Sequence, residues 1–264
     1  WRWVRDEAPA PSSARTAKVV APRPERVQES PHYRIATSAT PEQTQAVADA
    51  MEALRRAYLA TMGVTARGDG KLSLVLYKDR AEFQANNRSR PWAEAYYLAP
   101  HCYAYIGDGR NRYHWMLHEG VHQLNREVAG YTLPGWINEG LASYFGASRI
   151  VDGRLRPGDI DPDTYPIWWL PELWLSGDRR ADLADGTVLP LRTLMRSDRN
   201  DVNRRFNRYY IGYWSLSHFL FHYRDGRYAP GYLEVIRRGG SGEEFERLIG
   251  ALDRWNGPFR GQGG

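Results

Sequence analysis

The sequence predicts an α+β fold: a small mixed sheet followed by a mainly helical C-terminal part. Compact apolar runs bounded by turn-forming residues, typical of strands, come early in the chain, as at Leu72–Tyr77. Longer stretches with apolar residues three and four apart, typical of helices, come later, as over residues 209–223. Because strands and helices do not alternate, a doubly wound parallel sheet is not expected.

The first expected elements are a short strand over residues 33–37 and a long helix. Thr40-Pro41-Glu42-Gln43 has the pattern of a capping box with Pro in the first turn, which marks the start of this helix. Apolar residues then recur at steps of four, three and four, and they predict a buried face: Val47, Met51, Leu54 and Tyr58. The next elements are a strand over 72–77, a short helix over 79–86, and two extended pieces over 96–99 and 102–106.

Helices are expected to dominate the rest of the chain. Long ones are predicted over residues 112–127, 136–145 and 209–223, and short ones over 230–238 and 241–249. The pattern indicates three parts: an extended Pro-rich arm or linker over 1–30, one folded domain over 31–255, and a Gly-rich tail over 256–264.

Composition excludes several classes of protein. No run of about 18 apolar residues occurs, so no membrane span is expected. The single cysteine, Cys102, excludes an intrachain disulfide and a cysteine-rich structural zinc site. The net charge of +5 comes from scattered arginines, which indicates a solvated basic surface rather than a nucleic-acid partner. The chain begins at Trp1 without Met, so a secreted or periplasmic location with the signal removed is expected over a cytoplasmic one.

The chemistry concentrates in His118–His122 (HEGVH), inside the expected helix 112–127. His118 and His122 project from one face of the helix, one turn apart, so their nitrogens can converge on one zinc ion. Glu119 is rotated by about 100° from them, so it can reach a metal-bound water as a general base without being a ligand. The residues around the motif are apolar and indicate a buried helix, where polar side chains are costly unless a metal satisfies them.

His114 lies one turn before His118 on the same stripe of the helix. The helix rises about 12 Å from residue 114 to residue 122, which is too far for three ligands of one ion. The pair His118 and His122 is preferred because only this pair encloses Glu119. His114 is therefore expected to support a ligand or simply to pack in the core.

A third ligand is expected from residues 134–145 (PGWINEGLASYF). Glu139 is the one carboxylate at the start of an otherwise apolar helix, where a charge is costly without a cation. Gly140 and Ala142 would let this helix pack closely on a neighbour. The competing carboxylate is Glu127, which falls five residues after His122 and off the stripe of the ligands.

HEGVH, a short loop and PGWINEGLASYF together resemble the gluzincin metallopeptidases, most of all the bacterial peptidase-MA-like families of clan MA. The resemblance extends over roughly residues 33–250, and the two metal motifs are its specific part. Residues 210–220 (YIGYWSLSHFL) are similar to the Tyr-led helix of that group. One departure is that only 16 residues separate His122 from Glu139, so substrate contacts cannot be transferred from the thermolysin-like and aminopeptidase branches.

The resemblance implies a zincin-like fold in which an edge strand packs on the helix that carries HEGVH. It implies one zinc ion bound by His118, His122 and Glu139, with Glu119 as the general base. It also implies that a Tyr or His of a later helix stabilises the oxyanion. Tyr210 is the first choice for this role, and the alternatives are Tyr209, Tyr213 and His218.

Two further segments are candidates for substrate contacts. Residues 96–106 form either an extended edge, which in gluzincins can pair with a peptide substrate, or an internal part of the sheet. His101 and Cys102 lie there and are not expected as ligands, because the set of three is complete. Residues 165–174 (YPIWWLPELW) form either the wall or lid of a binding site or a plug in the core.

The expected function is zinc-dependent hydrolysis of a peptide bond in a peptide or protein substrate. One alternative is a non-catalytic module in which zinc only stiffens a helix pair, although such a site has no use for Glu119. Another is a carbohydrate- or cell-wall-binding protein that uses the Trp-rich insert. The sequence determines neither the oligomeric state nor the choice between endopeptidase and exopeptidase.

Overall fold

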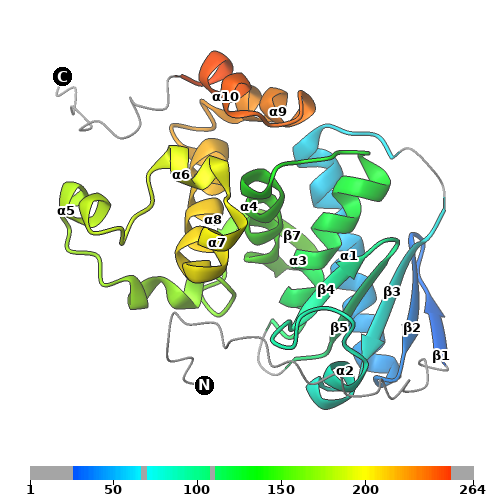
Figure 1. The fold of residues 1–264 in the computed structure, drawn as a ribbon. Helices are drawn as coiled ribbons and strands as arrows, with labels where there is room; N and C mark the ends of the chain where they lie inside the picture. The colour runs from blue at the N-terminus through cyan, green and yellow to red at the C-terminus, as the bar shows by residue number, and fades with distance from the viewer. Residues whose placement is uncertain (1–25, 67–69, 108–110, 251–264) are drawn as a thin grey trace. The chain divides into compact units, whose positions relative to one another are not determined.

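The computed structural model of the chain describes residues 26–66, 70–107 and 111–250 (Figure 1). These residues form an α+β structure with a small mixed sheet, which confirms the expected class. They divide into two compact units, which we call the sheet unit (26–132 and 141–168) and the helical unit (133–140 and 169–250). No helix within the described ranges is both long enough and apolar enough to cross a membrane.

The sheet unit contains a five-stranded sheet in the order β1-β2-β3-β5-β4. Its strands are β1 (Arg26–Glu29), β2 (Tyr33–Thr37), β3 (Leu72–Tyr77), β4 (Ala95–Leu98) and β5 (His101–Tyr105). The strands β2, β3 and β5 run parallel, and β1 and β4 pair antiparallel at the two edges of this sheet. Within residues 96–106, the first extended piece is therefore an edge strand and the second is internal.

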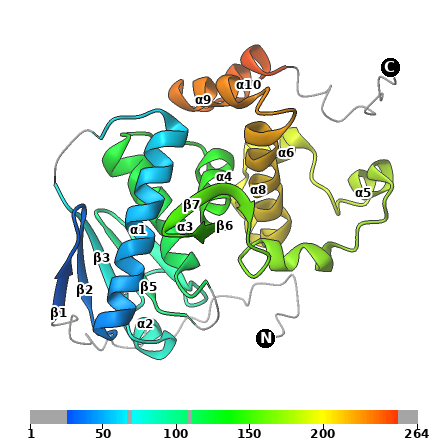
Figure 2. The same cartoon turned by 180° about the vertical axis from the view of Figure 1, so that it is seen from behind.

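Helices α1 (Pro41–Met62) and α3 (His114–Gln123) lie against one face of this sheet, and Figure 2 shows α1 running along it. The capping box at the start of α1 is confirmed, since Thr40 accepts from the Gln43 N–H and the Gln43 side chain accepts from the Thr40 N–H. All four residues of the expected face are completely buried: Val47, Met51, Leu54 and Tyr58. Each such side chain stabilises the fold by roughly 1.5–3 kcal/mol.

The short helix α2 (Arg80–Asn86) packs on the opposite face of the sheet, against β3 and β5. The side chain of Asp79 caps α2 by accepting from the Glu82 N–H. Phe83 of α2 is completely buried against Tyr77 and Tyr96, in a small aromatic core. The central strands are therefore buried on the face toward α1 and α3 and only partly buried on the face toward α2.

After α3 the chain continues through a π-helical turn, η1 (Leu124–Val128), and then through α4 (Gly135–Gly146). A hairpin of β6 (Ser148–Val151) and β7 (Arg154–Ile160) follows α4. The expectation that all strands precede the later helices is therefore wrong. The hairpin lies over α1, and the Arg56 side chain donates to the Gly153 backbone oxygen at the hairpin turn, at 3.0 Å.

The helical unit begins with the first turns of α4 and has Trp136 in its core. The indole of Trp136 stacks on Tyr232, meets Phe245 edge-on, and donates to the Gly240 backbone oxygen at 3.2 Å. The other elements of this part are α5 (Arg179–Ala184), α6 (Leu191–Arg196), α7 (Arg199–Arg204), α8 (Phe206–His222), α9 (Ala229–Arg237) and α10 (Gly242–Leu248). The short helix η2 (Ile167–Leu173) begins in the sheet unit and ends in the helical unit. The sequence predicted α8, α9 and α10 but not α5, α6 and α7.

The domain organisation differs from the expected one in two respects. Residues 26–29 form β1, so the prediction of an arm over residues 1–30 was wrong for these four residues. Residues 31–255 were expected to form one domain, and the described part of this range contains the boundary between the two units. Residues 1–25 and the tail 256–264 lie outside the described residues.

Candidate metal centre

Helix α3 carries HEGVH and lies on the sheet beside α1. It packs on β4 and β5 on one side and on α1 on another. Gly120 permits the contact with α1, because a Cβ atom there would lie 2.5 Å from Cε of Met51 and 3.0 Å from Cδ2 of Leu54. The glycine of HEGVH is thus explained by close helix packing, a reason independent of metal chemistry.

A buried glutamine ties α3 to the strands beneath it. Gln123 is completely buried, and its Nε2 donates to the backbone oxygens of Ser73 at 3.0 Å and Pro100 at 2.7 Å. One acceptor lies in β3 and the other lies between β4 and β5. The two hydrogen bonds therefore fix the position of α3 along the sheet and its rotation about its own axis. Sequence reasoning missed this role, although an amide in an otherwise apolar helix is a signal for a buried hydrogen bond.

Among the described residues, His118, Glu119 and His122 form the group that can hold a metal ion. One nitrogen from each histidine and one carboxylate oxygen all lie within 4.8 Å of one another. The centroids of the two imidazole rings are 5.0 Å apart, and the rings are inclined by 79°. His118 is buried, whereas Glu119 and His122 are partly exposed. The structure therefore brings together the three residues of HEGVH that the sequence singled out.

This donor set fits a zinc ion. Zinc takes imidazole nitrogens at about 2.0–2.1 Å in tetrahedral geometry, which places the centroids of two bound rings about 5 Å apart. The separation of 5.0 Å between the rings of His118 and His122 matches this value. The partial exposure of Glu119 and His122 leaves room for water and substrate to approach.

A glycine at the end of α4 lets this helix pack closely against α3. A Cβ atom on Gly146 would lie 3.3 Å from Cβ of His118 and 3.4 Å from its Cα and N. The absence of a side chain at Gly146 therefore lets α4 approach the backbone of His118, a candidate ligand. Sequence reasoning missed it, because a glycine at the end of an apolar helix is equally typical of a C-terminal cap.

His101 and Cys102 on β5, which were not expected to be ligands, are not part of the group formed by His118, Glu119 and His122. The Cys102 thiol donates to the backbone oxygen of Glu119 at 3.3 Å. Burial raises the pKa of this thiol, so it stays protonated at neutral pH and is not a thiolate ligand. His101 is the neighbouring residue on the strand, so its side chain points to the opposite face, where it meets the ring of Tyr103.

His114 packs in the sheet unit, as expected for a residue that is not a ligand. Its Nδ1 lies 2.9 Å from the backbone oxygen of Asn111, and its ring contacts Trp115 and Trp168. Burial lowers the pKa of His114 to about 4, and the neighbouring His118 acts in the same direction. The imidazole is therefore neutral at pH 7, with the Nδ1 proton donated to Asn111.

Glu127, the competitor for the third ligand, serves another purpose. It lies in η1, is exposed, and accepts a hydrogen bond from the hydroxyl of Tyr97 on β4. It is not part of the group formed by the two histidines and Glu119. Its hydrogen bond connects η1, which follows α3, to the edge strand β4.

Glu139 lies in the helical unit, whereas the two histidines lie in the sheet unit. Within its own unit Glu139 is half-buried, and its charge adds to the effect of burial that raises the pKa of Tyr213 to about 12. The neighbouring Gly140 fits against α8, because a Cβ atom there would lie 2.5 Å from Oγ of Ser217 and 2.9 Å from the backbone oxygen of Tyr213. The close packing expected at Gly140 is confirmed, and Glu139 as third ligand stays a prediction.

Two of the four candidates for the oxyanion donor have structural hydrogen bonds. The Tyr209 hydroxyl donates to Asp201 at 2.5 Å, and the Tyr213 hydroxyl donates to Oγ of Ser197 at 2.9 Å. Both tyrosines are almost completely buried. They anchor α8 within the helical unit, which makes them poor donors for a substrate.

Tyr210 and His218 are the other two candidates for this donor, and both lie on α8. Tyr210 is half-buried, and its ring stacks on Phe206 with the centroids 4.2 Å apart. His218 is also half-buried and packs beside Trp214. Tyr210 stays the predicted oxyanion donor, with His218 as the alternative.

The Trp-rich insert 165–174 contains η2 and is partly buried and partly exposed. Ile167 and Leu173 are buried, whereas Trp168 is 43% exposed and Trp174 is 83% exposed. Neither a core plug nor a freely exposed wall therefore describes the insert completely.

Comparisons with known proteins supply no relative. The chain matches no protein-family model, and a search of curated proteins finds no similar sequence. The function therefore has to be inferred from the residues themselves.

Proposed function

We propose that this protein is a zinc-dependent hydrolase that cleaves peptide bonds. The observation that carries the proposal is the cluster of donors from His118, Glu119 and His122, within 4.8 Å of one another, on a helix packed against an edge strand. Two imidazoles with an adjacent carboxylate supply both metal ligands and a base. A purely structural zinc site has no use for the base.

Glu139 is the proposed third ligand. Gly146 of α4 packs on His118, and Glu139 lies seven residues earlier, about two turns along the same face of this helix. It is the one acidic residue of α4, whose other residues are mostly apolar and buried. Three protein ligands would leave the fourth zinc position open, which distinguishes catalytic sites from structural ones.

In the proposed reaction, a bound zinc ion would polarise the scissile carbonyl and make a neighbouring water more acidic. The carboxylate of Glu119 takes a proton from that water, and the water oxygen attacks the carbonyl carbon. Protonated Glu119 then delivers the proton to the leaving amine nitrogen as the peptide bond breaks. The hydroxyl of Tyr210 donates a hydrogen bond to the oxyanion.

The edge strand β4 is the proposed docking element for the substrate. It packs on α3 and is hydrogen-bonded to β5 on its inner side. An extended peptide can add to the outer side of such a strand through main-chain hydrogen bonds. A peptide bound in this way would lie along α3, the helix that carries HEGVH.

The first test is Glu119→Gln, which keeps the size of the side chain but removes the base. We expect cleavage of a peptide library, followed by mass spectrometry, to slow by at least about 10²–10⁴-fold, while the zinc content is unchanged. Glu127→Gln is the matched control, because it makes the same change eight residues later on an exposed residue. Full activity in Glu119→Gln would overturn the mechanism.

The second test assigns the third ligand by zinc content. We expect elemental analysis to show that Glu139→Ala loses bound zinc, whereas Glu127→Ala retains it. Circular dichroism would confirm that both variants are folded. Equal zinc content in Glu139→Ala and the wild type would reassign the ligand.

A non-catalytic binding protein is the second candidate function, and the exposure of Trp168 and Trp174 favours it. Exposed indole rings offer flat apolar surfaces of the kind that bind sugar rings. If this alternative holds, the wild type is retained on cell-wall polysaccharide, and Trp174→Ala is not. Equal retention of the two proteins, or none, would exclude this use of the insert.

A further inference from the structure

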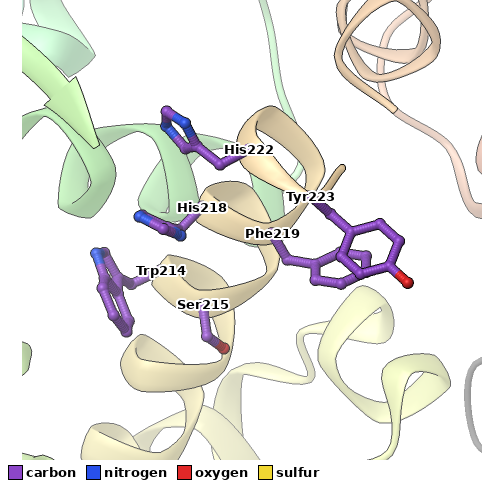
Figure 3. Close-up of a pocket in the computed structure, with 6 residues that line it drawn as sticks. All are labelled: Trp214, Ser215, His218, Phe219, His222 and Tyr223. Atoms are coloured by element: carbon purple, nitrogen blue, oxygen red, sulfur yellow. The ribbon is translucent and has the colours of Figure 1, made fainter. Parts of the chain in front are cut away.

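Helix α8 carries an open pocket of about 310 Å³ in the helical unit (Figure 3). Its lining consists of two rows, each with a spacing of four residues along the helix: Trp214, His218 and His222, and Ser215, Phe219 and Tyr223. The four-residue spacing places the members of each row one above the other. Five of the six lining residues belong to α8, and the sixth, Tyr223, directly follows it. The shape of the pocket therefore depends on α8 alone.

The first row contains a second pair of histidines with the spacing of HEGVH. The ring centroids of His218 and His222 are 4.7 Å apart, close to the 5.0 Å between His118 and His122. Figure 3 shows both rings projecting from the same side of α8. His222 is exposed and His218 is half-buried, so a dissolved ion can reach the pair.

Two imidazoles at this separation fit one transition-metal ion. Ring centroids about 5 Å apart are expected when both nitrogens lie about 2.0–2.1 Å from the ion. The neutral imidazole is the form that binds a metal. Trp214 packs on the ring of His218 and limits its rotation.

We propose that His218 and His222 form a second metal site that binds one transition-metal ion of the kind imidazole prefers, such as Zn²⁺, Ni²⁺ or Cu²⁺. Water completes the coordination, because the six residues that line the pocket include no carboxylate and no thiol. With two protein ligands on an exposed helix face, this site binds zinc more weakly than a site with three. The proposal goes beyond the hydrolase function and does not depend on it.

The test is calorimetric titration of Zn²⁺ into metal-free protein that carries no affinity tag. We expect the wild type to bind two equivalents, and His222→Ala to lose the weaker one. Ser215→Ala and Tyr223→Phe alter the same pocket without removing an imidazole, so both are expected to keep two equivalents. His222 is exposed, and its replacement is expected to leave the fold intact, which circular dichroism would verify.

The double variant His118→Ala/His122→Ala separates the two sites. We expect it to keep the weaker equivalent, and we expect that equivalent to disappear when His222→Ala is added. A wild type that binds one equivalent, lost in the double variant and kept in His222→Ala, would overturn the second site while supporting the first. The second site is therefore supported if the double variant still binds one zinc ion and loses it when His222→Ala is added. It is overturned if the double variant binds no zinc while His222→Ala binds as much as the wild type.

Discussion

At the scale of single residues, the polar side chains on and after α3 divide into candidate metal ligands and residues that hold the helix. His114 and Gln123 bond to backbone oxygens, and Asn125 accepts from the hydroxyl of Tyr58 at 2.7 Å. Each of these three side chains has a hydrogen-bond partner within the protein, although Nε2 of His114 and Oε1 of Gln123 are buried without one. His118, Glu119 and His122 form the candidate metal group, because their possible ligand atoms all lie within 4.8 Å of one another.

His114 is half-buried and neutral in the fold, which predicts a specific pH dependence of stability. Its pKa falls from 6.5 in the unfolded chain to about 4 in the fold, so the unfolded chain binds more protons below pH 6.5. The stabilisation is complete above pH 6.5 and is lost as the pH falls toward 4, by up to about 3 kcal/mol. Urea unfolding of the metal-free protein at pH 7, 6 and 5 measures this loss.

His114→Gln is the control for that measurement, since glutamine does not titrate. The free energy of unfolding of this variant is expected to fall less between pH 7 and 5 than that of the wild type. Identical slopes in the two proteins would show that His114 is not held in its neutral form.

The bond between Tyr58 and Asn125 predicts a loss of stability in Tyr58→Phe. Both residues are buried, so the substitution removes a donor from a carbonyl oxygen that water does not reach easily. We expect the free energy of unfolding to fall by about 1–3 kcal/mol. Tyr97→Phe also removes a hydroxyl donor, in this case to the exposed carboxylate of Glu127, and it is expected to cost less. Equal losses would contradict the assigned role of burial.

At the scale of elements, two glycines of α4 lie where this helix contacts its neighbours most closely. Gly140 permits close contact with α8 in the helical unit, and Gly146 permits close contact with α3 in the sheet unit. A side chain at either position meets backbone atoms, which cannot move aside as a flexible side chain can. The apolar pattern predicts the helix, but only the neighbouring helices explain why these two positions lack a side chain.

This packing predicts that Gly140→Ala destabilises the protein despite the better helix propensity of alanine. The added methyl group would overlap with Oγ of Ser217 and the backbone oxygen of Tyr213, at an expected cost of about 1–3 kcal/mol. Gly242→Ala, in the first turn of α10, is the matched control, because nothing lies within 4 Å of the position that its methyl group would take. In denaturant titrations it is expected to be neutral or to stabilise by up to about 1 kcal/mol. A Gly140→Ala variant as stable as Gly242→Ala would refute the tight contact.

At the scale of the whole molecule, the chain builds two units from segments that are not contiguous. The sheet unit takes residues 141–168 after the helical unit has taken 133–140. The division falls inside α4, so a boundary at a flexible linker, which a sequence would reveal, does not exist there. This explains why one domain was expected over residues 31–255.

Metal removal provides a prediction for the whole molecule. A ligand that binds only the folded state stabilises it, by about 2.7 kcal/mol at a hundred times its dissociation constant. For a chain of this size, that corresponds to a rise in Tm of roughly 5–10 °C. We expect a chelator to lower the Tm of the zinc-loaded wild type by this amount, as measured by calorimetry. His118→Ala/His122→Ala is expected to lack most of the shift, and an unchanged shift would exclude HEGVH as the principal site.

Features that depend on short spacings along the chain can be predicted from the sequence alone. The cap at Thr40, the buried face of α1, the limits of β3 and the proximity of His118, Glu119 and His122 all follow from local geometry. Local chemistry acts within one or two turns, so a single sequence is enough to predict it. The proposed chemistry rests on this local cluster.

Contacts between distant elements, in contrast, are visible only in the folded protein. The structure shows that β4 is an edge strand, that Glu127 is used by Tyr97, and that Gly146 lies against His118. These last two contacts join residues that are 28 to 30 positions apart in the chain. No spacing rule reports them, because they depend on how helices and strands pack rather than on the periodicity of any one element.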